Sequence, residues 1–118
     1  MRINYITLGT NDRPAAEAFY DRLLEGSEFE KIYSEDRMTM WVRDGFMFAL
    51  AEPFDGNPAS TGNGSMFGFQ VESDAEVNRL HKLALTLGGS DEGEPRVRSE
   101  HQSAYVRDLD GNKICFYA

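Results

Sequence analysis

The sequence is poor in residues that build covalent or metal cross-links, since it has one cysteine, Cys115, and two histidines. A lone cysteine excludes an internal disulfide and any multi-cysteine zinc site. No apolar run approaches the roughly 18 residues of a membrane span, and no charged-then-apolar leader precedes the first strand-like segment. Basic residues are also few, 12 against 20 acidic ones, for a net charge of −8, which argues against phosphate-rich partners. We therefore expect a cytoplasmic protein that binds neither nucleic acid nor membrane.

The length of 118 residues suits one compact domain, because two independent cores would not fit. Within this length the chain repeats its pattern. Residues 3–9 alternate, with Ile6 and Leu8 on one face, and Phe67 and Phe69 alternate in the same way in the second half. This period of two is typical of a strand that is covered on one face. Each half is therefore predicted to open with a strand.

A capped amphipathic helix is predicted after each of these strands. In the first half Asp12 can cap the helix and Pro14 suits its first turn, and in the second half Ser73 and Glu76 form a capping box. Both apolar stripes have the spacing i, i+3, i+4 and i+7. They comprise Ala16, Phe19, Tyr20 and Leu23 in the first half and Val77, Leu80, His81 and Ala84 in the second. Cap and stripe recur together, with Ser73 following Asp12 by 61 residues.

A four-residue motif also occurs twice. Residues 105–108 (Tyr-Val-Arg-Asp) repeat residues 41–44 (Trp-Val-Arg-Asp), and each copy leads to an Asp-Gly pair. Asp-Gly between β-prone segments favours a hairpin, because glycine adopts positive φ without steric cost. We therefore predict a strand, a tight turn and a second strand in both places, with Trp41 and Tyr105 at equivalent positions.

The turn formers concentrate in one internal segment. Residues 53–65 are rich in glycine, proline, asparagine and serine, so they are predicted to be a linker. The predicted organisation is one domain of residues 1–118, with a first module of about 1–52 and a second of about 66–118. Each module has the order βαβββ, which makes the fold class α+β.

Several of these segments resemble those of a known family. The most specific is the Asp-Leu-Asp-Gly-Asn turn at residues 108–112, followed by residues 18–24 on the first helix and residues 5–8 on the first strand. With the repeat, they make the chain similar to the vicinal oxygen chelate superfamily, which groups glyoxalase I, bleomycin resistance proteins and extradiol dioxygenases. The resemblance implies a curved mixed sheet around a cleft, helices on the outer face and a homodimer. It does not fix a reaction, because the superfamily hosts many.

The resemblance also indicates where a metal ion would lie. Members of the superfamily hold the metal in the cleft with a histidine on the first strand of a module and a glutamate on its last strand, or equivalents. The matching positions here are Tyr5, Ala49, Met66 and Cys115. These side chains offer no chelate, because zinc and iron need three or four suitable donors. We therefore expect no metal and no other cofactor.

Strand alternation predicts which side chains line the cleft. With Val42 and Val106 assigned to the core, Trp41 and Tyr105 fall on the cleft side. The predicted ligand contacts are Tyr5, Thr7, Trp41, Met66, Gln70, Arg98, Tyr105 and Cys115. This aromatic and sulfur-rich wall suits a small apolar or cationic molecule. In the alternative interpretation, the same side chains fill a closed cleft or a dimer interface.

Two side chains are candidates for catalysis. His101 lies in a polar stretch before the strand of Tyr105, where it is either a solvated loop residue or an acid or base at the rim of the pocket. Cys115 is either a small buried residue or a nucleophile whose thiol could be activated by Lys113, two residues away on the same strand face. His81 lies on a helix stripe and is expected to be structural.

Two classes of function are compatible with these observations. The first is a metal-independent binding protein that resembles the bleomycin resistance group and takes up a bulky or cationic compound. The second is a lyase or another small-molecule enzyme of the same superfamily, with either an atypical site around His101, Cys115, Tyr5 and Arg98 or a metal held by donors that the motifs do not identify. Metal analysis would separate the two most directly.

Overall fold

The computed structural model describes all 118 residues, and the chain forms two compact units. Unit 1 comprises Met1–Ser60 and unit 2 comprises Thr61–Ala118. Each unit contains one α-helix and a four-stranded mixed sheet in the order βαβββ, so the predicted α+β fold is confirmed. Neither helix is both long and apolar enough to cross a membrane.

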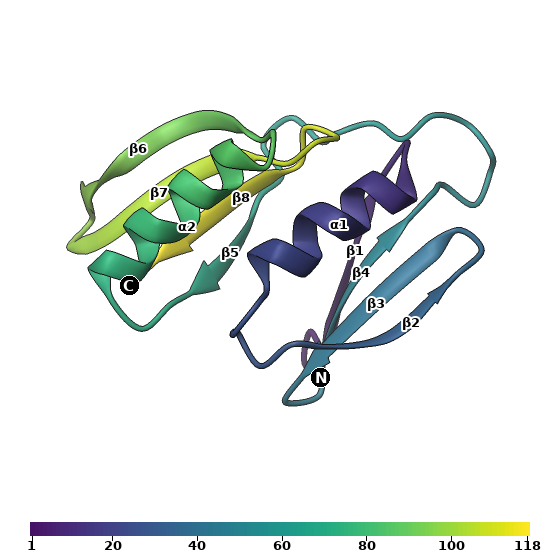
Figure 1. Cartoon of the computed structure of the whole chain (residues 1–118), viewed down its shortest axis with the longest axis horizontal. Helices are drawn as coiled ribbons and strands as arrows, with labels where there is room; N and C mark the ends of the chain where they lie inside the picture. Colours follow the sequence, from purple (N-terminus) through teal and green to yellow (C-terminus); the bar gives the residue numbers. More distant parts are fainter. The chain divides into compact units, whose positions relative to one another are not determined.

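Unit 1 is built on a sheet with the strand order β1-β4-β3-β2 (Figure 1). Its elements are β1 (Tyr5–Gly9), α1 (Arg13–Leu23), β2 (Glu30–Glu35), β3 (Met38–Arg43) and β4 (Phe46–Ala51). β1 runs parallel to β4, and the other neighbours are antiparallel. Because parallel strands need a crossover connection, α1 and the β2–β3 hairpin lie between β1 and β4 in the sequence.

α1 covers one face of this sheet with the stripe predicted from the sequence. Asp12 caps the helix by accepting a hydrogen bond from the Ala15 N–H at 3.1 Å. The buried residues of the helix are Ala16, Phe19, Tyr20 and Leu23. The Tyr20 ring packs against those of Phe48 and Trp41, with centroid distances of 4.9 and 6.2 Å. The core of unit 1 therefore lies between α1 and the sheet face that carries Phe48 and Trp41.

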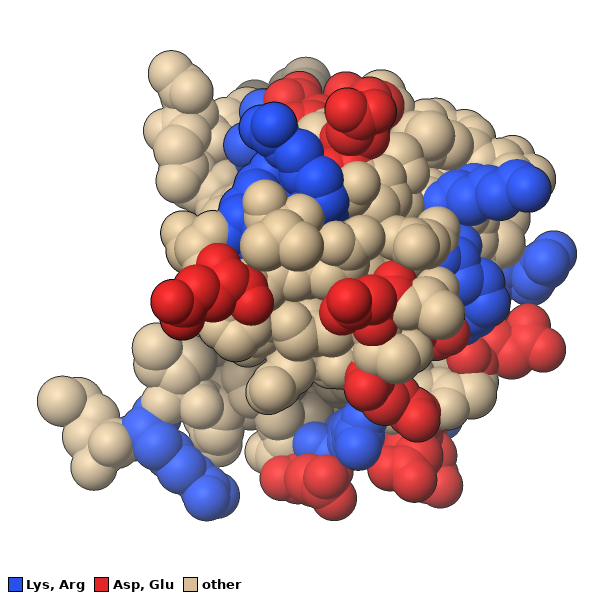
Figure 2. All heavy atoms as spheres, turned by 90° about the vertical axis from the view of Figure 1, so that its left-hand side faces the viewer, with Lys and Arg blue, Asp and Glu red and all other residues tan.

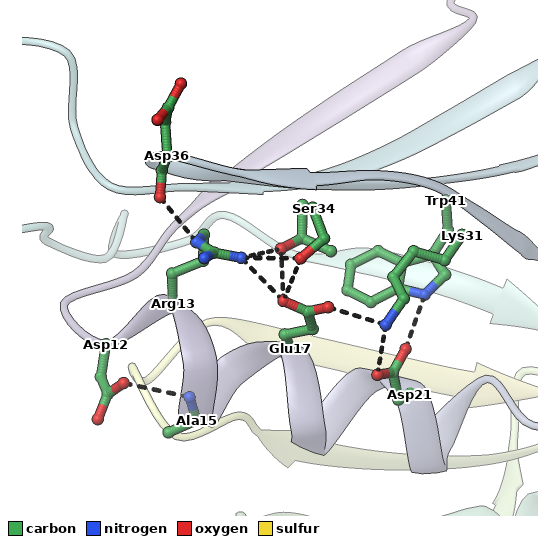
Figure 3. A network of polar contacts seen from close by, with 10 residues as sticks. Asp12, Arg13, Ala15, Glu17, Asp21, Lys31, Ser34, Asp36 and Trp41 are labelled. Carbon is green, nitrogen blue, oxygen red and sulfur yellow. Dashed lines mark hydrogen bonds and ion pairs between the residues drawn. The ribbon is translucent and has the colours of Figure 1, made fainter.

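A polar network connects α1 to β2 and β3 beside this core (Figure 3). At its centre Glu17, whose side chain is only 15% exposed, accepts hydrogen bonds at 2.8–3.0 Å from Arg13, Lys31, Ser34 and Thr39. Burial by itself raises the pKa of Glu17, but the hydrogen bonds from Lys31, Ser34 and Thr39 outweigh it and hold the pKa below its usual value. The network satisfies a half-buried carboxylate and anchors the helix.

Unit 2 repeats this topology with the strand order β5-β8-β7-β6 (Figure 1). Its elements are β5 (Phe67–Gln70), α2 (Asp74–Thr86), β6 (Ser90–Arg98), β7 (His101–Arg107) and β8 (Lys113–Tyr117). β5 is parallel to β8, and the remaining neighbours are antiparallel. The predicted repetition of one βαβββ pattern is thus confirmed.

α2 covers one face of its sheet as α1 does. Ser73 caps the helix by accepting from the Glu76 N–H at 3.1 Å. The buried residues of the helix are Val77, Leu80, His81 and Ala84. His81 Nε2 lies 2.9 Å from Asp91 Oδ1, so it packs on the helix side as expected for a structural residue. Gly88, with φ of 104°, follows the end of the helix.

The two Asp-Gly hairpins differ in length. In unit 1 Arg43 pairs with Phe46, and Asp44 and Gly45 form a two-residue turn with φ of 50° and 77°, as type I′ geometry requires. In unit 2 Arg107 pairs with Lys113, which leaves a five-residue loop. The buried Asp108 carboxylate organises that loop by accepting from the Asp110 and Asn112 N–H groups, both at 2.9 Å. The predicted hairpin is therefore present in both units, with a two-residue turn in unit 1 and, in unit 2, a longer loop that contains a β-turn closed by the Gly111 N–H and the Asp108 carbonyl at 3.1 Å.

Candidate functional site

The sheet face that α2 leaves uncovered, called here the open face of unit 2, carries most of the polar side chains predicted to bind a ligand. Ala104, Val106 and Ile114 are fully buried on the opposite face, so their neighbours along β7 and β8 point to the open face. By register, the open face carries Gly68, Gln70, Ser90, Gly93, Arg96, Arg98, His101, Ser103, Tyr105, Arg107, Lys113, Cys115 and Tyr117.

Tyr105 lies at the centre of this face, and its half-buried ring is held in one orientation. A cation from each neighbouring strand approaches the ring: Arg98 Cζ lies 5.0 Å and Lys113 Nζ 5.3 Å from its centroid. Gly93 of β6 leaves room for the ring, because a Cβ there would lie 2.8 Å from Tyr105 Cδ2. Cys115 is the partner of Tyr105 on β8. The ring is therefore a preorganised contact surface.

Two of the three arginines of this face, Arg98 and Arg107, are held by different acceptors. Arg107 Nε donates to Glu92 Oε1 at 2.7 Å and its Nη1 to the Gly111 carbonyl at 2.8 Å, and this arginine holds the pKa of Glu92 below its usual value. Arg98 instead donates to the backbone carbonyls of Ser103 and Glu94. Carbonyl oxygens carry no net charge, so Arg98 is fixed in place without a direct ion pair, and its charge reaches the Asp91 carboxylate only from a distance.

Cys115 lies beside Tyr105 but has the properties of a buried thiol. It is 8% exposed, and burial raises its pKa, while Tyr105, Arg98 and Lys113 lower it by less. The thiolate is the nucleophilic form, so this environment does not activate Cys115 at neutral pH. The predicted alternative of a small buried residue describes its environment better.

His101, the other catalytic candidate, is exposed at the start of β7. Its Nδ1 lies 3.0 Å from the Ala118 carbonyl oxygen, and its ring meets the Tyr117 ring edge-on at 6.1 Å. Cys115 pairs with Tyr105, four residues along β7 from His101, which corresponds to about 13 Å of strand. The structure therefore does not bring His101 and Cys115 together.

Trp41 lies on the helix-covered face of unit 1, so its prediction as a ligand contact is wrong. Its side chain is 2% exposed, and its Nε1 donates to Asp21 Oδ1 on α1 at 3.2 Å (Figure 3). Val42, which was assigned to the core, is half-exposed on the opposite face.

The reason is a one-residue offset between the two hairpins. Ala49 and Cys115 are equivalent, since they pair with Thr7 and Gly68, which are 61 residues apart, like the two helix caps. Met40 pairs with Ala49, and Tyr105 pairs with Cys115. The structural counterpart of Tyr105 is therefore Met40, and Trp41 corresponds to Val106. A shift of one residue moves a strand side chain to the other face.

The remaining predicted ligand contacts are divided between the units. Tyr5, 60% exposed, and Thr7 lie on the face of the unit 1 sheet away from α1, as the register with β4 requires. Met66 directly precedes β5 and is 52% exposed, and Gln70 is exposed at the end of β5 opposite Tyr117. Of the predicted set, the structure gathers Arg98, Tyr105 and Cys115 into one cluster.

The positions that would hold the metal of the superfamily do not supply a suitable donor set. Tyr5 and Ala49 occupy them in unit 1, and Met66 and Cys115 in unit 2. No group of three or more histidine, cysteine, aspartate or glutamate side chains is arranged to bind a metal ion. Alanine has no donor atom and a methionine thioether is a soft ligand, so these residues do not fit a divalent metal.

Two members of the Tyr105 cluster were not among the predicted site residues. Lys113 was placed on the correct face but considered only as a neighbour of Cys115. Gly93 was missed, although a glycine within a strand is a sign that another group approaches the backbone closely.

Comparison with known proteins agrees with this architecture. The family model described as Glyoxalase/Bleomycin resistance protein/Dioxygenase superfamily matches residues 2–116. A glyoxalase/bleomycin resistance protein from Albidiferax ferrireducens is similar in structure, with 31% identity, a TM-score of 0.90, and coverage of 97% of this chain and 95% of that one. No curated protein sequence gave a significant match.

More distant solved structures share the fold. A glyoxalase-related enzyme from Fulvimarina pelagi has 22% identity and a TM-score of 0.81, with 99% of this chain and 87% of that chain covered. Lactoylglutathione lyase from Agrobacterium tumefaciens has 23% identity and a TM-score of 0.74, with 98% and 92% covered. The two βαβββ units thus have the glyoxalase-type fold. The chain belongs to the glyoxalase/bleomycin resistance/dioxygenase superfamily.

Proposed function

We propose that the protein binds a small organic molecule on the open face of unit 2 by direct side-chain contacts. The observation that carries this proposal is the oriented ring of Tyr105, with Arg98 and Lys113 at 5.0 and 5.3 Å from its centroid. An apolar or aromatic surface with a few fixed polar groups is typical of small-molecule sites. Tyr5 and Thr7 are proposed as further ligand contacts on the corresponding face of unit 1.

The structure does not favour the cationic ligand that was expected from the sequence. That expectation rested on the net charge of −8 and on exposed rings of Trp41 and Tyr105. Trp41 is buried beneath α1, and the Tyr105 ring already has two protein cations beside it. Acidic and basic side chains are also interspersed on the face drawn in Figure 2, so the net charge does not describe each surface.

An enzymatic reaction centred on Cys115 and His101 has less support. Burial raises the pKa of the Cys115 thiol, and the pairing of Cys115 with Tyr105 rather than with the start of β7 keeps it away from His101. General base activation of a nucleophile needs the two groups within hydrogen-bond reach. Binding without chemistry is therefore the function that the geometry supports best.

We also propose that the chain forms a homodimer. β1 is an edge strand of the unit 1 sheet, and its residues Tyr5–Gly9 include no charged side chain and no proline. The preceding Ile3 is 87% exposed. An edge strand without such protection is a template for pairing with another strand, and a second copy of the chain would cover it.

The binding proposal can be tested with a neutral aromatic probe. Titration of the 15N-labelled protein with 2-naphthalenemethanol, followed by NMR, should give saturable shifts, and Tyr105→Ala should weaken binding about tenfold through loss of a ring contact. Phe54→Ala is the matched control, because it removes a ring that is 89% exposed on a loop of unit 1. Equal affinity of the wild type and Tyr105→Ala would contradict the proposal.

A further inference from the structure

We infer that Arg98 and Lys113 together receive an acidic group of the ligand, so that the molecule bound on the open face of unit 2 is an aromatic or apolar organic acid. The acidic group is an oxyanion such as a carboxylate, phosphate or sulfonate. This inference rests on the proposed binding function and adds the chemical class of the ligand.

The first observation is the way in which Arg98 is held. Its Nη2 donates to the Glu94 carbonyl at 2.8 Å, and its Nη1 donates to the carbonyl and, at 3.4 Å, to the hydroxyl of Ser103. These bonds fix the guanidinium without neutralising it, and they leave its Nε–H without a hydrogen bond. A positioned arginine with a donor to spare is suited to bind an oxyanion by a charge-assisted hydrogen bond.

The second observation is that Lys113 also lacks a carboxylate partner. Its ammonium group contacts the Tyr105 ring and forms no ion pair, whereas Arg107 on the same face is paired with Glu92. Nearby Asp91 is engaged on the helix side, where its Oδ1 contacts His81 Nε2. Glu92 and Asp91 therefore each have another side chain as their contact partner, and they act on Lys113 and Arg98 only from a distance.

The consequence is a local excess of positive charge in a protein with a net charge of −8. Two cations within about 5 Å of one ring centroid repel each other, and the Tyr105 ring offsets only part of this cost. An oxyanion beside the ring would relieve the repulsion. A cationic ligand in the same place would add to it.

A matched series of naphthalene probes tests the inference. 2-Naphthoate, 2-naphthalenemethanol and 2-naphthylmethylamine share one ring and differ in charge. NMR titration of the wild type should show the naphthoate binding at least about fivefold more tightly than the alcohol, and the amine binding most weakly. The advantage of the naphthoate should shrink at high salt, since salt screens exposed charges. 2-Naphthyl phosphate, run in parallel, distinguishes a carboxylate from a phosphate preference.

Variants then assign the effect to the two cations. Lys113→Gln and Arg98→Gln should each lower the affinity for the naphthoate more than the affinity for the alcohol, and so reduce the ratio of the two affinities. Arg79→Gln is the control, because it removes one positive charge from α2 of the same unit and should change neither affinity. Since Arg98 also binds backbone carbonyls, its variant is interpreted only with an unchanged amide spectrum, and Lys113→Gln provides the independent test.

The outcomes separate the two proposals. Equal affinities for the alcohol and the naphthoate would overturn the inference that Arg98 and Lys113 receive an acidic group, and so would an affinity ratio that Lys113→Gln leaves unchanged. In either case the proposed binding function stands. If no probe of any charge binds, the binding function itself fails, and the inference fails with it.

Discussion

Replacing Trp41 by alanine should cost far more stability than replacing Tyr105, although both residues open the same four-residue motif. Trp41 is 2% exposed beneath α1, and removing a buried tryptophan costs about 3–5 kcal/mol. The substitution also deprives Asp21 of the indole N–H bond. Tyr105 is half-buried on the open face, where its loss removes two cation–ring contacts of about 0.5–1 kcal/mol each.

The next residue of the motif should show the opposite order. Val106 is fully buried, so Val106→Ala should cost about 2 kcal/mol from the lost methyl groups and the cavity left behind. Val42 lies on the face of the unit 1 sheet away from α1 and is half-exposed, so Val42→Ala should cost less than about 1 kcal/mol. The one-residue offset therefore predicts that alanine costs more stability at Trp41 than at Tyr105, and more at Val106 than at Val42.

Urea unfolding followed by far-ultraviolet circular dichroism measures all four variants without relying on tryptophan fluorescence. A shift in midpoint at constant slope reports the change in the free energy of unfolding. Similar costs for Trp41→Ala and Tyr105→Ala, together with similar costs for Val42→Ala and Val106→Ala, would refute the offset and the assignment of faces derived from it.

Three further predictions concern charge, metal and assembly. Because the pKa of Glu17 is lowered on folding, its contribution to stability is present above the ordinary pKa of 4.5 and is lost as the pH falls through the lower folded value; Glu17→Gln should therefore flatten the acid limb of a stability–pH curve, and an unchanged limb would contradict this. Protein purified without added metal should contain no stoichiometric divalent ion and gain little thermal stability from one, whereas elemental analysis near one equivalent would be contrary evidence. Sedimentation equilibrium at micromolar concentration should show a dimer, and a monomer alone would disprove the proposed assembly.

The caps and the buried stripes of the two helices could be predicted to the residue because their signals are local. The caps at Asp12 and Ser73 and the apolar spacing that follows each of them depend only on the geometry of one helix. The buried residues of α1 and α2 are the predicted ones. The fold class followed from the same local patterns once their repetition was recognised.

The faces of the strands were harder to predict because they depend on hairpin pairing. The similarity of residues 41–44 to 105–108 suggested equivalent positions, but the Asp108 side chain organises a loop three residues longer than the Asp44-Gly45 turn. That difference moved Trp41 to the helix-covered face. The assignment in unit 2 was correct, since Val106, Ile114 and Phe116 are buried as predicted.

The cluster around Tyr105 could be predicted only in part. Alternation placed Tyr105, Cys115 and Lys113 on one face, but the position of Arg98 depends on irregular pairing of β6 with β7 between Asp91 and Arg96. Irregularities of this kind change the direction in which the following side chains point. The sequence around Gly93 does not specify by how many residues the pairing shifts.

Intermolecular nuclear Overhauser effects test most directly whether the ligand lies against Tyr105 on the open face of unit 2. With 2-naphthoate bound to the protein, the account predicts cross-peaks from the naphthalene protons to the Tyr105 ring and to the Lys113 side chain. Cross-peaks only to residues of the helix-covered face, such as Ile114 or Val106, or only to residues of unit 1, would contradict it.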